Sequence, residues 1–462
     1  MVSSSGKRRI LVIGGGFSGL LAARDLANEF DVTVVDAKEY FEYTPGVLRA
    51  FVHPEHFDAL SFTYQSVLER KMGVKFLWGE VKSLDTEKRL AHIKPMFSKQ
   101  TEEIGFDYCV IAAGCNFGVF HKWGESLWFP TVHEDARPEG SWAHIDERFI
   151  EGRRRHILEE HEKLKALNQK RAKVLIVGAG FIGVEWATEL QHYFPNLSIT
   201  IIDFLPKCLG PLPESAATYC DNYMKENGIA RYYGVKYAPN EPGFYEKIGY
   251  SAAPDATYVC VGVKSSAYFM PKESLSGYNP LEADKREKDP KKCGPGGGGW
   301  IRVNKKLQVL RKDAQGNDQI CGGGRIFAVG DCNMVMDVAP IPKISYPSEE
   351  QAAHVCTNIK VIDHLEHNAA APGGCFGFGG AKQLMETWWP WGAGMFATSL
   401  GPDDACFVCN AKSTPGTGIL TLWGKPSAIQ KELIESTKVD ECKYGLFGRM
   451  GWHFVHHTPF YN

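Results

Sequence analysis

Three glycines and one aspartate near the N-terminus have the types and the spacing of a nucleotide-binding turn. Gly14, Gly16 and Gly19 follow an apolar, β-branched run, and Asp36 ends a second such run 17 positions after Gly19. Gly14 permits a tight turn from strand to helix, Gly16 lets a pyrophosphate approach the backbone, and Gly19 lets the helix pack closely on the strand. Free N–H groups at the start of that helix favour a diphosphate. With the acid placed to accept hydrogen bonds from a ribose, residues 8–41 are predicted to form a βαβ dinucleotide-binding unit.

The same pattern returns later in the chain. Gly178, Gly180 and Gly183 follow another apolar run, and Asp203 stands 20 positions after Gly183. Two complete fingerprints 164 residues apart predict two bound dinucleotides. A carboxylate at Asp203 favours a free 2′-hydroxyl and repels a 2′-phosphate, so the second site is expected to prefer NADH over NADPH.

Three further strand-like runs end at a glycine, namely Gly114, Gly262 and Gly330. Gly114 follows the first fingerprint, and Gly262 has the corresponding place after the second. Asp331 follows the third, and beside two nucleotide-binding folds it is expected to hydrogen-bond the ribityl chain of a flavin. The helix that comes next is expected to point its N-terminus at a flavin pyrimidine carbonyl.

Composition narrows the class of protein. The chain has 462 residues, enough for two or three domains, and 52 basic against 54 acidic residues give a formal net charge of -2. Without a global positive field, no nucleic-acid partner is expected. Thirteen cysteines scattered through strands of intracellular type predict reduced thiols and an intracellular compartment, either the cytoplasm or the periphery of an organelle membrane. No signal or transit peptide and no apolar stretch of transmembrane length is evident, so any membrane contact is expected to be peripheral.

Several segments lie outside the nucleotide-binding pattern. Residues 145–168 are charge-rich, and we interpret them as a solvated connecting helix in preference to a nucleic-acid patch around Arg153, Arg154 and Arg155. Residues 280–299 are interpreted as a flexible surface insertion without chemistry.

Beyond residue 375 the sequence is rich in aromatic residues and glycine, which suggests an α+β cap. Its Cys406-x-x-Cys409 is interpreted as two core cysteines in preference to a redox or metal pair, and no metal site is expected. Its aromatic side chains favour core packing, with a groove for an acceptor or a membrane platform as the alternative. They are Trp388, Trp389, Trp391, Phe396 and Phe407.

Together these features resemble a known class, the FAD-dependent pyridine nucleotide oxidoreductases with two dinucleotide-binding domains. Within it the chain is most similar to the apoptosis-inducing-factor-like, ferroptosis-suppressor type NAD(P)H:quinone oxidoreductases, with type II NADH dehydrogenases as near relatives. The residues that carry the closer likeness are YTPGVLRAF at 43–51, Gly183-Val184-Glu185, PKISY at 342–346, and SLGPDDACFV at 399–408.

The resemblance implies an α/β fold with two Rossmann-like domains, the NAD domain inserted in the FAD domain, and a C-terminal α+β cap. The implied segments are FAD-binding at 1–150, NAD(H)-binding at 151–300, FAD-binding again at 301–375, and cap at 376–462. It implies that FAD is held by Gly14, Gly16, Gly19, Asp36, Lys38, Arg49, the backbone of Val81, and Asp331. The nicotinamide cofactor is implied at Gly178, Gly180, Gly183 and Asp203. Glu185 is then the acid that contacts nicotinamide, and Lys343 the basic residue near the flavin.

The activity implied is transfer of a hydride from NADH to flavin, and of electrons onward to an acceptor. No CxxxxC follows the first fingerprint, where disulfide reductases of this class keep their redox pair, so a small acceptor is expected, above all a quinone. Two alternatives stay open. One is a redox-responsive flavoprotein that serves as a structural or signalling subunit, and the other is a reductase for a protein such as a ferredoxin or thioredoxin. A homodimer or larger complex is compatible with each.

Overall fold

The computed structural model describes residues 6–117, 127–130, 132, 145–280, 293–338, 341–370, 395–410 and 418–457. The chain forms two compact units. The first unit comprises residues 1–41, 63–116 and 263–389, and the second unit comprises residues 42–62, 117–262 and 390–462. The four-segment division implied by the resemblance stays a prediction.

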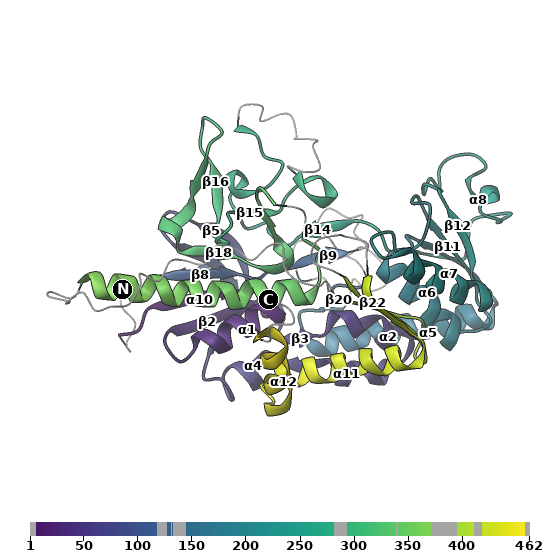
Figure 1. Ribbon diagram of the computed structural model, residues 1–462, viewed down its shortest axis with the longest axis horizontal. Helices are drawn as coiled ribbons and strands as arrows, with labels where there is room; N and C mark the ends of the chain where they lie inside the picture. The colour runs from purple at the N-terminus through teal and green to yellow at the C-terminus, as the bar shows by residue number, and fades with distance from the viewer. Residues whose placement is uncertain are drawn as a thin grey trace. The chain divides into compact units, whose positions relative to one another are not determined.

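A seven-stranded sheet is the centre of the first unit (Figure 1). Its strands, in spatial order, are β18 (Ile326–Ala328), β8 (Tyr108–Ile111), β1 (Arg9–Ile13), β2 (Asp31–Asp36), β5 (Lys75–Asp85), β6 (Leu90–Pro95) and β7 (Glu102–Gly105). The first five strands are parallel, and β5, β6 and β7 form an antiparallel meander. Because β1 lies between β2 and β8, its carboxyl end is the point where the strand order reverses, the place where doubly wound sheets bind ligands.

Two helices pack on each other beside this sheet. They are α1 (Phe17–Leu26) and α10 (Ser345–Ala370), and Figure 1 shows α10 running alongside α1. The other elements of the first unit are short: α4 (Tyr64–Leu68), β14 (Val263–Ser265), β15 (Ile301–Val303), β16 (Leu310–Lys312), β17 (Asp318–Ile320) and β19 (Asn333–Val335). Three strands span positions where the chain passes between the units, namely β3 (Tyr40–Glu42), β4 (Ser61–Thr63) and β9 (Cys115–Phe117).

The second unit repeats the parallel design. Its four-stranded sheet has the order β12 (Ala230–Tyr233), β11 (Ser198–Asp203), β10 (Lys173–Val177) and β13 (Ala256–Val259), all parallel. An antiparallel cap sheet consists of β20 (Met395–Ser399), β21 (Ala405–Asn410) and β22 (Gly418–Trp423). The helices are α2 (Val47–Val52), α3 (Phe57–Leu60), α5 (Ile150–Gln169), α6 (Phe181–Tyr193), α7 (Glu214–Glu226), α8 (Phe244–Lys247), α11 (Lys425–Cys442) and α12 (Leu446–His457). The α/β architecture predicted from the sequence is therefore confirmed.

The interpretation of α5 as a solvated helix is wrong on one side of the helix, where Arg153, His156 and Glu160 are buried. Arg153 is fully buried and forms ion pairs with Glu42 (2.8 Å) and Glu147 (2.9 Å), which are buried as well. Arg155 instead pairs with Glu159 on the helix surface. A buried charge is tolerated only when it is paired and hydrogen-bonded, and the partners of Arg153 lie far away in the sequence or outside the helix. The charge pattern of the helix alone could not reveal them.

The glycine-rich end of the predicted insertion is ordered by packing, which corrects its interpretation as flexible sequence. Gly294 and Gly296–Gly299 all have positive φ. A Cβ on Gly296 would lie 2.4 Å from the carbonyl oxygen of Val263, and one on Gly298 would lie 2.7 Å from that of Ser276. Glycine is required there because backbone passes so close. The run leads to Trp300, which is fully buried.

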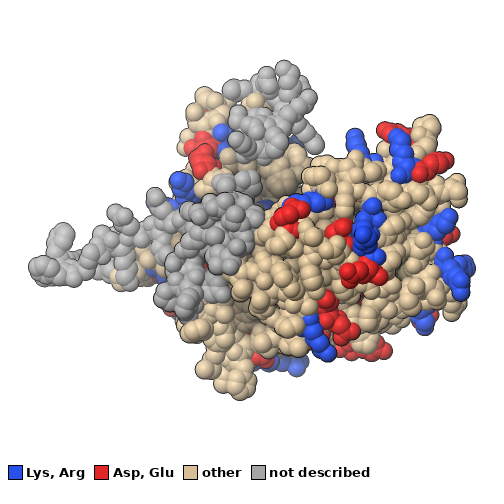
Figure 2. Space-filling view, turned by 45° about the vertical axis from the view of Figure 1, so that its right-hand side comes forward, with Lys and Arg blue, Asp and Glu red and all other residues tan. Residues whose placement is uncertain are grey.

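The charged surface is mixed in sign. Figure 2 shows acidic and basic side chains interspersed on the visible face, in agreement with a net charge of -2. Among the described residues, no helix has the length and apolar character needed to cross a bilayer.

Candidate active site and dinucleotide-binding turns

The first fingerprint forms a tight turn in which two glycines have no room for a side chain. Gly14 follows β1 with φ of +100°, and its N–H donates to Val35 O over 2.8 Å. A Cβ on Gly14 would lie 2.4 Å from Ala112 O, and one on Gly19 would lie 1.9 Å from Gly14 O. These contacts explain both glycines sterically: one permits the turn and the other the close approach of α1.

Gly16 has a different surrounding. A Cβ on it would meet nothing within 4 Å, and Gly16 begins α1 without a side-chain cap. The N–H groups of the first turn of α1 are therefore available to a ligand, and the helix dipole favours an anion there. This geometry fits a diphosphate.

Asp36 holds the turn itself. One carboxylate oxygen accepts the N–H of Gly15 over 2.7 Å, and the other accepts that of Lys38 over 2.8 Å. Each oxygen keeps further acceptor capacity for a ribose hydroxyl. The sequence predicts the ribose contact but not this second role, in which the acid fixes its own binding loop.

The second fingerprint reproduces the arrangement almost atom for atom. Gly178 has φ of +107° and donates to Ile202 O over 2.8 Å, and a Cβ on Gly183 would lie 1.7 Å from Gly178 O. Gly180 begins α6 without a side-chain cap, and a Cβ there would again meet nothing within 4 Å. The second turn is thus built for the same kind of ligand as the first.

Asp203 repeats the role of Asp36. Its two carboxylate oxygens accept the N–H groups of Ala179 (2.6 Å) and Leu205 (2.8 Å). Asp203 is largely buried. The chain therefore contains two equivalent acid-anchored turns, one in each unit.

Asp331 and Lys343 are two half-buried charged residues of the first unit whose charges attract each other. Burial raises the pKa of Asp331, and Lys343 and the hydroxyl of Ser348, whose Oγ lies 3.0 Å from Asp331 Oδ1, oppose that rise. Burial likewise lowers the pKa of Lys343, against the attraction of Asp331. The Lys343 ammonium donates to Asn333 O and lies 4.7 Å from the centroid of the Trp300 ring. Two such groups are costly to desolvate, which is typical of a functional site.

Two residues at the start of α10, Ser348 and Gln351, form hydrogen bonds around Asp331 and Gly330, and the sequence did not predict them. The N–H of Gly330, which has φ of +73°, donates to Gln351 Oε1 over 2.7 Å. Ser18 Oγ donates to Ser348 O over 2.9 Å and so ties α1 to α10. The polar run SYPSEEQ at the start of the helix, directly after the loop that follows Asp331, is the signal that could have identified them.

The other predicted cofactor residues lie as follows. Val81 is buried in β5, where the register with β6 shifts, and Lys38 places its ammonium 5.1 Å from the Tyr40 ring centroid. Gly114 and Gly262 have φ of +71° and +90°, and a Cβ on Gly114 would meet nothing within 4 Å. Their contacts with a cofactor stay predictions.

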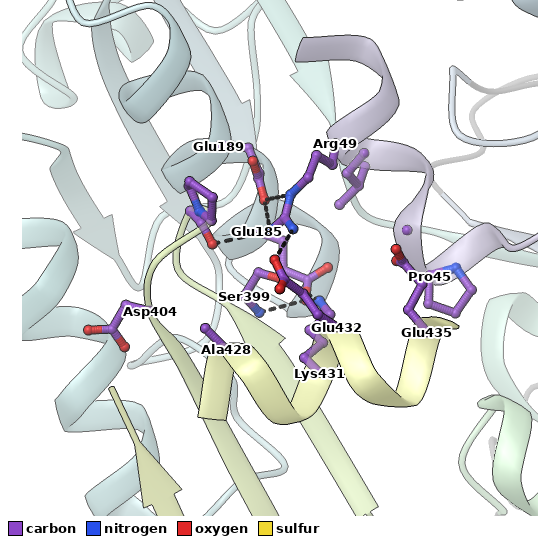
Figure 3. Close-up of a pocket in the computed structure, with 14 residues that line it drawn as sticks. Pro45, Arg49, Glu185, Glu189, Ser399, Asp404, Ala428, Lys431, Glu432 and Glu435 are labelled. Carbon is purple, nitrogen blue, oxygen red and sulfur yellow. Dashed lines mark hydrogen bonds and ion pairs between the residues drawn. The ribbon is translucent and has the colours of Figure 1, made fainter. Parts of the chain in front are cut away.

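Glu185 lies in a pocket of the second unit, shown in Figure 3. Its Oε1 accepts the N–H of Ser399 over 2.8 Å and is paired with the ammonium of Lys431. The acid comes from α6, while Ser399 and Lys431 come from β20 and α11. The cap thus holds the side chain of the predicted nicotinamide contact.

Arg49 lies in the same pocket. Its guanidinium donates to Glu189 Oε1 over 2.8 and 3.1 Å and to Gly401 O over 3.3 Å. Burial works against the charge, but Glu189 outweighs it, so the pKa of Arg49 is raised. The structure thus gives Arg49 partners within the second unit, and the predicted contact of Arg49 with FAD stays a prediction. Of the cap aromatics, Trp388, Trp389 and Trp391 lie outside the described residues.

Known proteins with similar sequences and folds include NADH:quinone oxidoreductases. A type II NADH:quinone oxidoreductase of Staphylococcus haemolyticus is 22% identical over 461 residues, covering 94% of this chain and 95% of that protein. Ferroptosis suppressor protein 1 of Xenopus laevis is 23% identical over 365 residues, covering 76% and 80%. The structure of NDH2 from Plasmodium falciparum in complex with NADH superposes with a TM-score of 0.62 at 12% identity, covering 98% and 99%.

Two acid-anchored turns of the kind that binds dinucleotides, one in each unit, are typical of FAD-dependent oxidoreductases with two dinucleotide-binding folds. Residues 8–354 match the family described as pyridine nucleotide-disulphide oxidoreductase. The chain belongs to that family, and the predicted class and fold are confirmed.

Proposed function

We propose that this protein oxidises NADH with a bound FAD and passes the electrons to a quinone. The observation that carries the proposal is that the glycine turn occurs twice, once in each unit. Two such turns in one chain suit two dinucleotides, of which one is the bound FAD and the other the NADH that donates the hydride. Asp331 and Lys343, whose charges attract each other, both belong to the first unit, which favours this unit for FAD. The names of the relatives, type II NADH:quinone oxidoreductase among them, support the choice of donor and acceptor.

Each turn is suited to its dinucleotide. Gly16 and Gly180 leave the helix N-termini open to the diphosphates, and Asp36 and Asp203 face the riboses. The carboxylate of Asp203 disfavours a 2′-phosphate, so NADH is the preferred donor.

Bound FAD supplies the capacity to accept a hydride and to release electrons to a second substrate. The chain's own contribution is electrostatic and positional. Asp331 accepts a hydrogen bond from a hydroxyl of the ribityl chain, and the ammonium of Lys343 stabilises negative charge that develops nearby. Glu185, fixed by Ser399 and Lys431, positions the nicotinamide.

The absence of a CxxxxC after the first fingerprint supports direct transfer to a small acceptor. A quinone also suits a protein that works at a membrane surface. On α12, Leu446, Phe447, Met450 and Phe454 are 59%, 86%, 63% and 67% exposed. Residues 443–462 contain no acidic residue. An apolar, aromatic helix face with only basic charge favours peripheral contact with an anionic membrane, in the cytoplasm or at an organelle.

An anaerobic stopped-flow experiment tests the proposal. The purified protein is expected to show a flavin absorbance band that NADH bleaches faster than NADPH, and a quinone to restore it faster than ferredoxin, thioredoxin or oxygen. Absence of flavin, or flavin that NADH does not reduce, would overturn the proposal. Rapid reduction to a stable complex with negligible turnover on every acceptor would favour a redox-responsive subunit, and light scattering would then show whether NADH changes the assembly.

Membrane contact is tested separately by sedimentation with vesicles. The wild-type protein is expected to sediment with anionic vesicles and to stay in solution with neutral ones. Phe447→Asp combined with Phe454→Asp should abolish sedimentation, whereas Phe97→Asp, at an exposed site of the first unit, should not. Equal binding by all three proteins would contradict a role for α12.

A further inference from the structure

One aromatic side chain beside the second dinucleotide-binding turn is left in solvent. Phe204 follows Asp203 directly, at the end of β11, and is 67% exposed. Other aromatic residues packed around this sheet are buried: Phe244, Tyr250 and Tyr258 are 3%, 5% and 7% exposed. A phenyl ring that stays in water forgoes the free energy of burial, which a ligand that covers the ring would recover.

The backbone on both sides of Phe204 is fixed by hydrogen bonds. The carbonyl oxygen of Asp203 accepts the N–H of Val235 over 2.9 Å, and its carboxylate accepts the N–H of Leu205 over 2.8 Å. The carbonyl oxygen of Leu205 in turn accepts the N–H of Gly234 over 3.0 Å. Because both neighbours are held, Phe204 presents its ring from a fixed backbone, and contact with a ligand requires little further ordering of the chain.

The neighbouring strand leaves open space at the same edge of the sheet. β11 and β12 are parallel, and their last residues, Asp203 and Tyr233, are in register. Gly234 comes next, with φ of +72°, and a Cβ on it would meet nothing within 4 Å. Ligands of parallel sheets bind outside the carboxyl ends of the strands. Phe204 and Gly234 therefore both border the edge at which a ligand of this sheet would lie.

The order of the strands gives the direction in which a dinucleotide would run. The glycine turn proposed for the diphosphate follows β10, and Asp203, proposed for a ribose, ends β11. The sheet order is β12, β11, β10 and β13, so β12 is the next strand in the same direction. The base attached to that ribose would therefore lie beyond Asp203, on the side of Phe204 and Gly234.

We infer, on the basis of the proposed function, that Phe204 binds the adenine of NADH by stacking its ring on the face of the base. Stacking of a base on an aromatic side chain strengthens binding by about 10-fold. The contact is at the adenosine end of NADH, away from the nicotinamide, so it strengthens binding of the ground state and of the transition state equally. Phe204 thus sets the affinity for NADH and leaves the rate of hydride transfer unchanged.

The test compares NADH with reduced nicotinamide mononucleotide, a hydride donor that lacks the adenosine half. Protein with bound FAD is mixed with each donor without oxygen, and bleaching of the flavin is followed by stopped flow. In Phe204→Ala the half-saturating NADH concentration should rise about 10-fold at an unchanged maximal rate. The half-saturating concentration of the mononucleotide should stay at the wild-type value, and Phe204→Trp should restore the affinity for NADH. Equal weakening of both donors would overturn the inference.

ADP-ribose, which has the adenine, both riboses and the diphosphate but no nicotinamide, gives a readout without electron transfer. Calorimetric titration of the FAD-loaded protein should show about 10-fold weaker binding of ADP-ribose to Phe204→Ala than to the wild type. The control is Phe97→Ala, at an 80% exposed site of the first unit, which should bind ADP-ribose as the wild type does.

The outcomes separate this inference from the proposed function. The ring of Phe204 is exposed, so Phe204→Ala should fold with an unchanged unfolding midpoint. Equal binding of ADP-ribose by the wild type and Phe204→Ala would overturn the role of Phe204 alone. A wild-type protein that binds neither NADH nor ADP-ribose would overturn the proposed function, and this inference with it.

Discussion

The carboxylate of Asp203 accepts a hydrogen bond from the backbone N–H of Ala179 over 2.6 Å, so the acid that we propose for the donor's ribose also fixes the turn that we propose for its diphosphate. Asp36 has the same relationship with Gly15, over 2.7 Å. At each site one side chain therefore stabilises the turn and, on our proposal, also sets selectivity.

Asp203→Asn should have two effects. The amide has a single acceptor oxygen, so one backbone N–H loses its partner at a cost of about 1–3 kcal/mol in the free energy of unfolding. Loss of the negative charge should raise the use of NADPH relative to NADH. The matched control is Asp36→Asn, which removes equivalent hydrogen bonds in the first unit and should cost similar stability. If it changed the coenzyme ratio as much as Asp203→Asn, the assignment of the second turn to the donor would be wrong.

Gly16→Ala and Gly180→Ala should fold normally but lose one ligand each. A methyl group at either position meets no protein atom within 4 Å, so the free energy of unfolding should change by no more than about 1 kcal/mol. The methyl group instead occupies the approach to a diphosphate. Gly16→Ala is expected to be purified without flavin, and Gly180→Ala with flavin that NADH reduces poorly.

The control for these variants is the third glycine of each turn. In Gly19→Ala and Gly183→Ala the Cβ meets a backbone oxygen within 2 Å, so the helix must move. A loss of about 3 kcal/mol or more is expected from such overpacking. Urea unfolding of the four variants separates the two effects, and equal losses at all four positions would contradict the steric account.

Glu185→Gln should slow flavin reduction by about 10²-fold while bound FAD stays at the wild-type level. The control is Glu189→Gln, one helical turn further on, whose partner is Arg49. That variant is expected to be less stable but to reduce flavin at the normal rate per folded molecule. Anaerobic single-turnover kinetics gives both rates, and equal rates for Glu185→Gln and the wild type would leave Glu185 a structural residue.

Arg153→Met should be severely destabilising, by about 3–5 kcal/mol, because it leaves Glu42 and Glu147 charged and buried without their cation. Arg155→Met removes a surface pair and should cost less than about 1 kcal/mol. Denaturant unfolding of the two variants distinguishes the buried charge from the exposed one. Comparable losses would show that Arg153 is solvated, as its sequence context indicates.

Stability without cofactor should depend on pH through Asp331. Its pKa in the folded protein is raised, so its stabilising contribution is complete below the usual value of 3.8 and is lost as the pH rises through the folded pKa. The free energy of unfolding of the wild type minus that of Asp331→Asn should therefore fall as the pH rises above about 3.8.

Asp318 supplies a control of opposite sign. Although burial opposes it, Lys312 and Arg302 lower the pKa of Asp318, so its contribution is present above 3.8 and is lost as the pH falls. The corresponding difference for Asp318→Asn should instead rise with pH, and it should do so in the range below about pH 4. Parallel slopes for the two variants would contradict the role of burial at Asp331.

The features that could be predicted from the sequence are those that local chemistry dictates. Gly14 and Gly178 were identified because a strand-to-helix turn needs positive φ, and the strands around them because buried parallel strands are continuously apolar. Arg153 was misjudged because its partners lie elsewhere in the chain, and a run of arginines looks the same whether buried or exposed. Gln351 was missed for a similar reason: its acceptor oxygen matters only because the fold brings it to Gly330.

The two hydrogen bonds of Asp203 also constrain attempts to redesign the enzyme for another coenzyme. Exchange of the acid for a small neutral residue removes the charge but releases Ala179 and Leu205 as well, so the loop loses its shape together with its selectivity. An engineer would do better to keep the carboxylate and to work on the exposed side chains after it. Of these, Phe204 is 67% exposed, and its backbone N–H is not one of the two donors to Asp203. The position next to the acid is therefore the site at which coenzyme preference can be changed without the loss of these two hydrogen bonds.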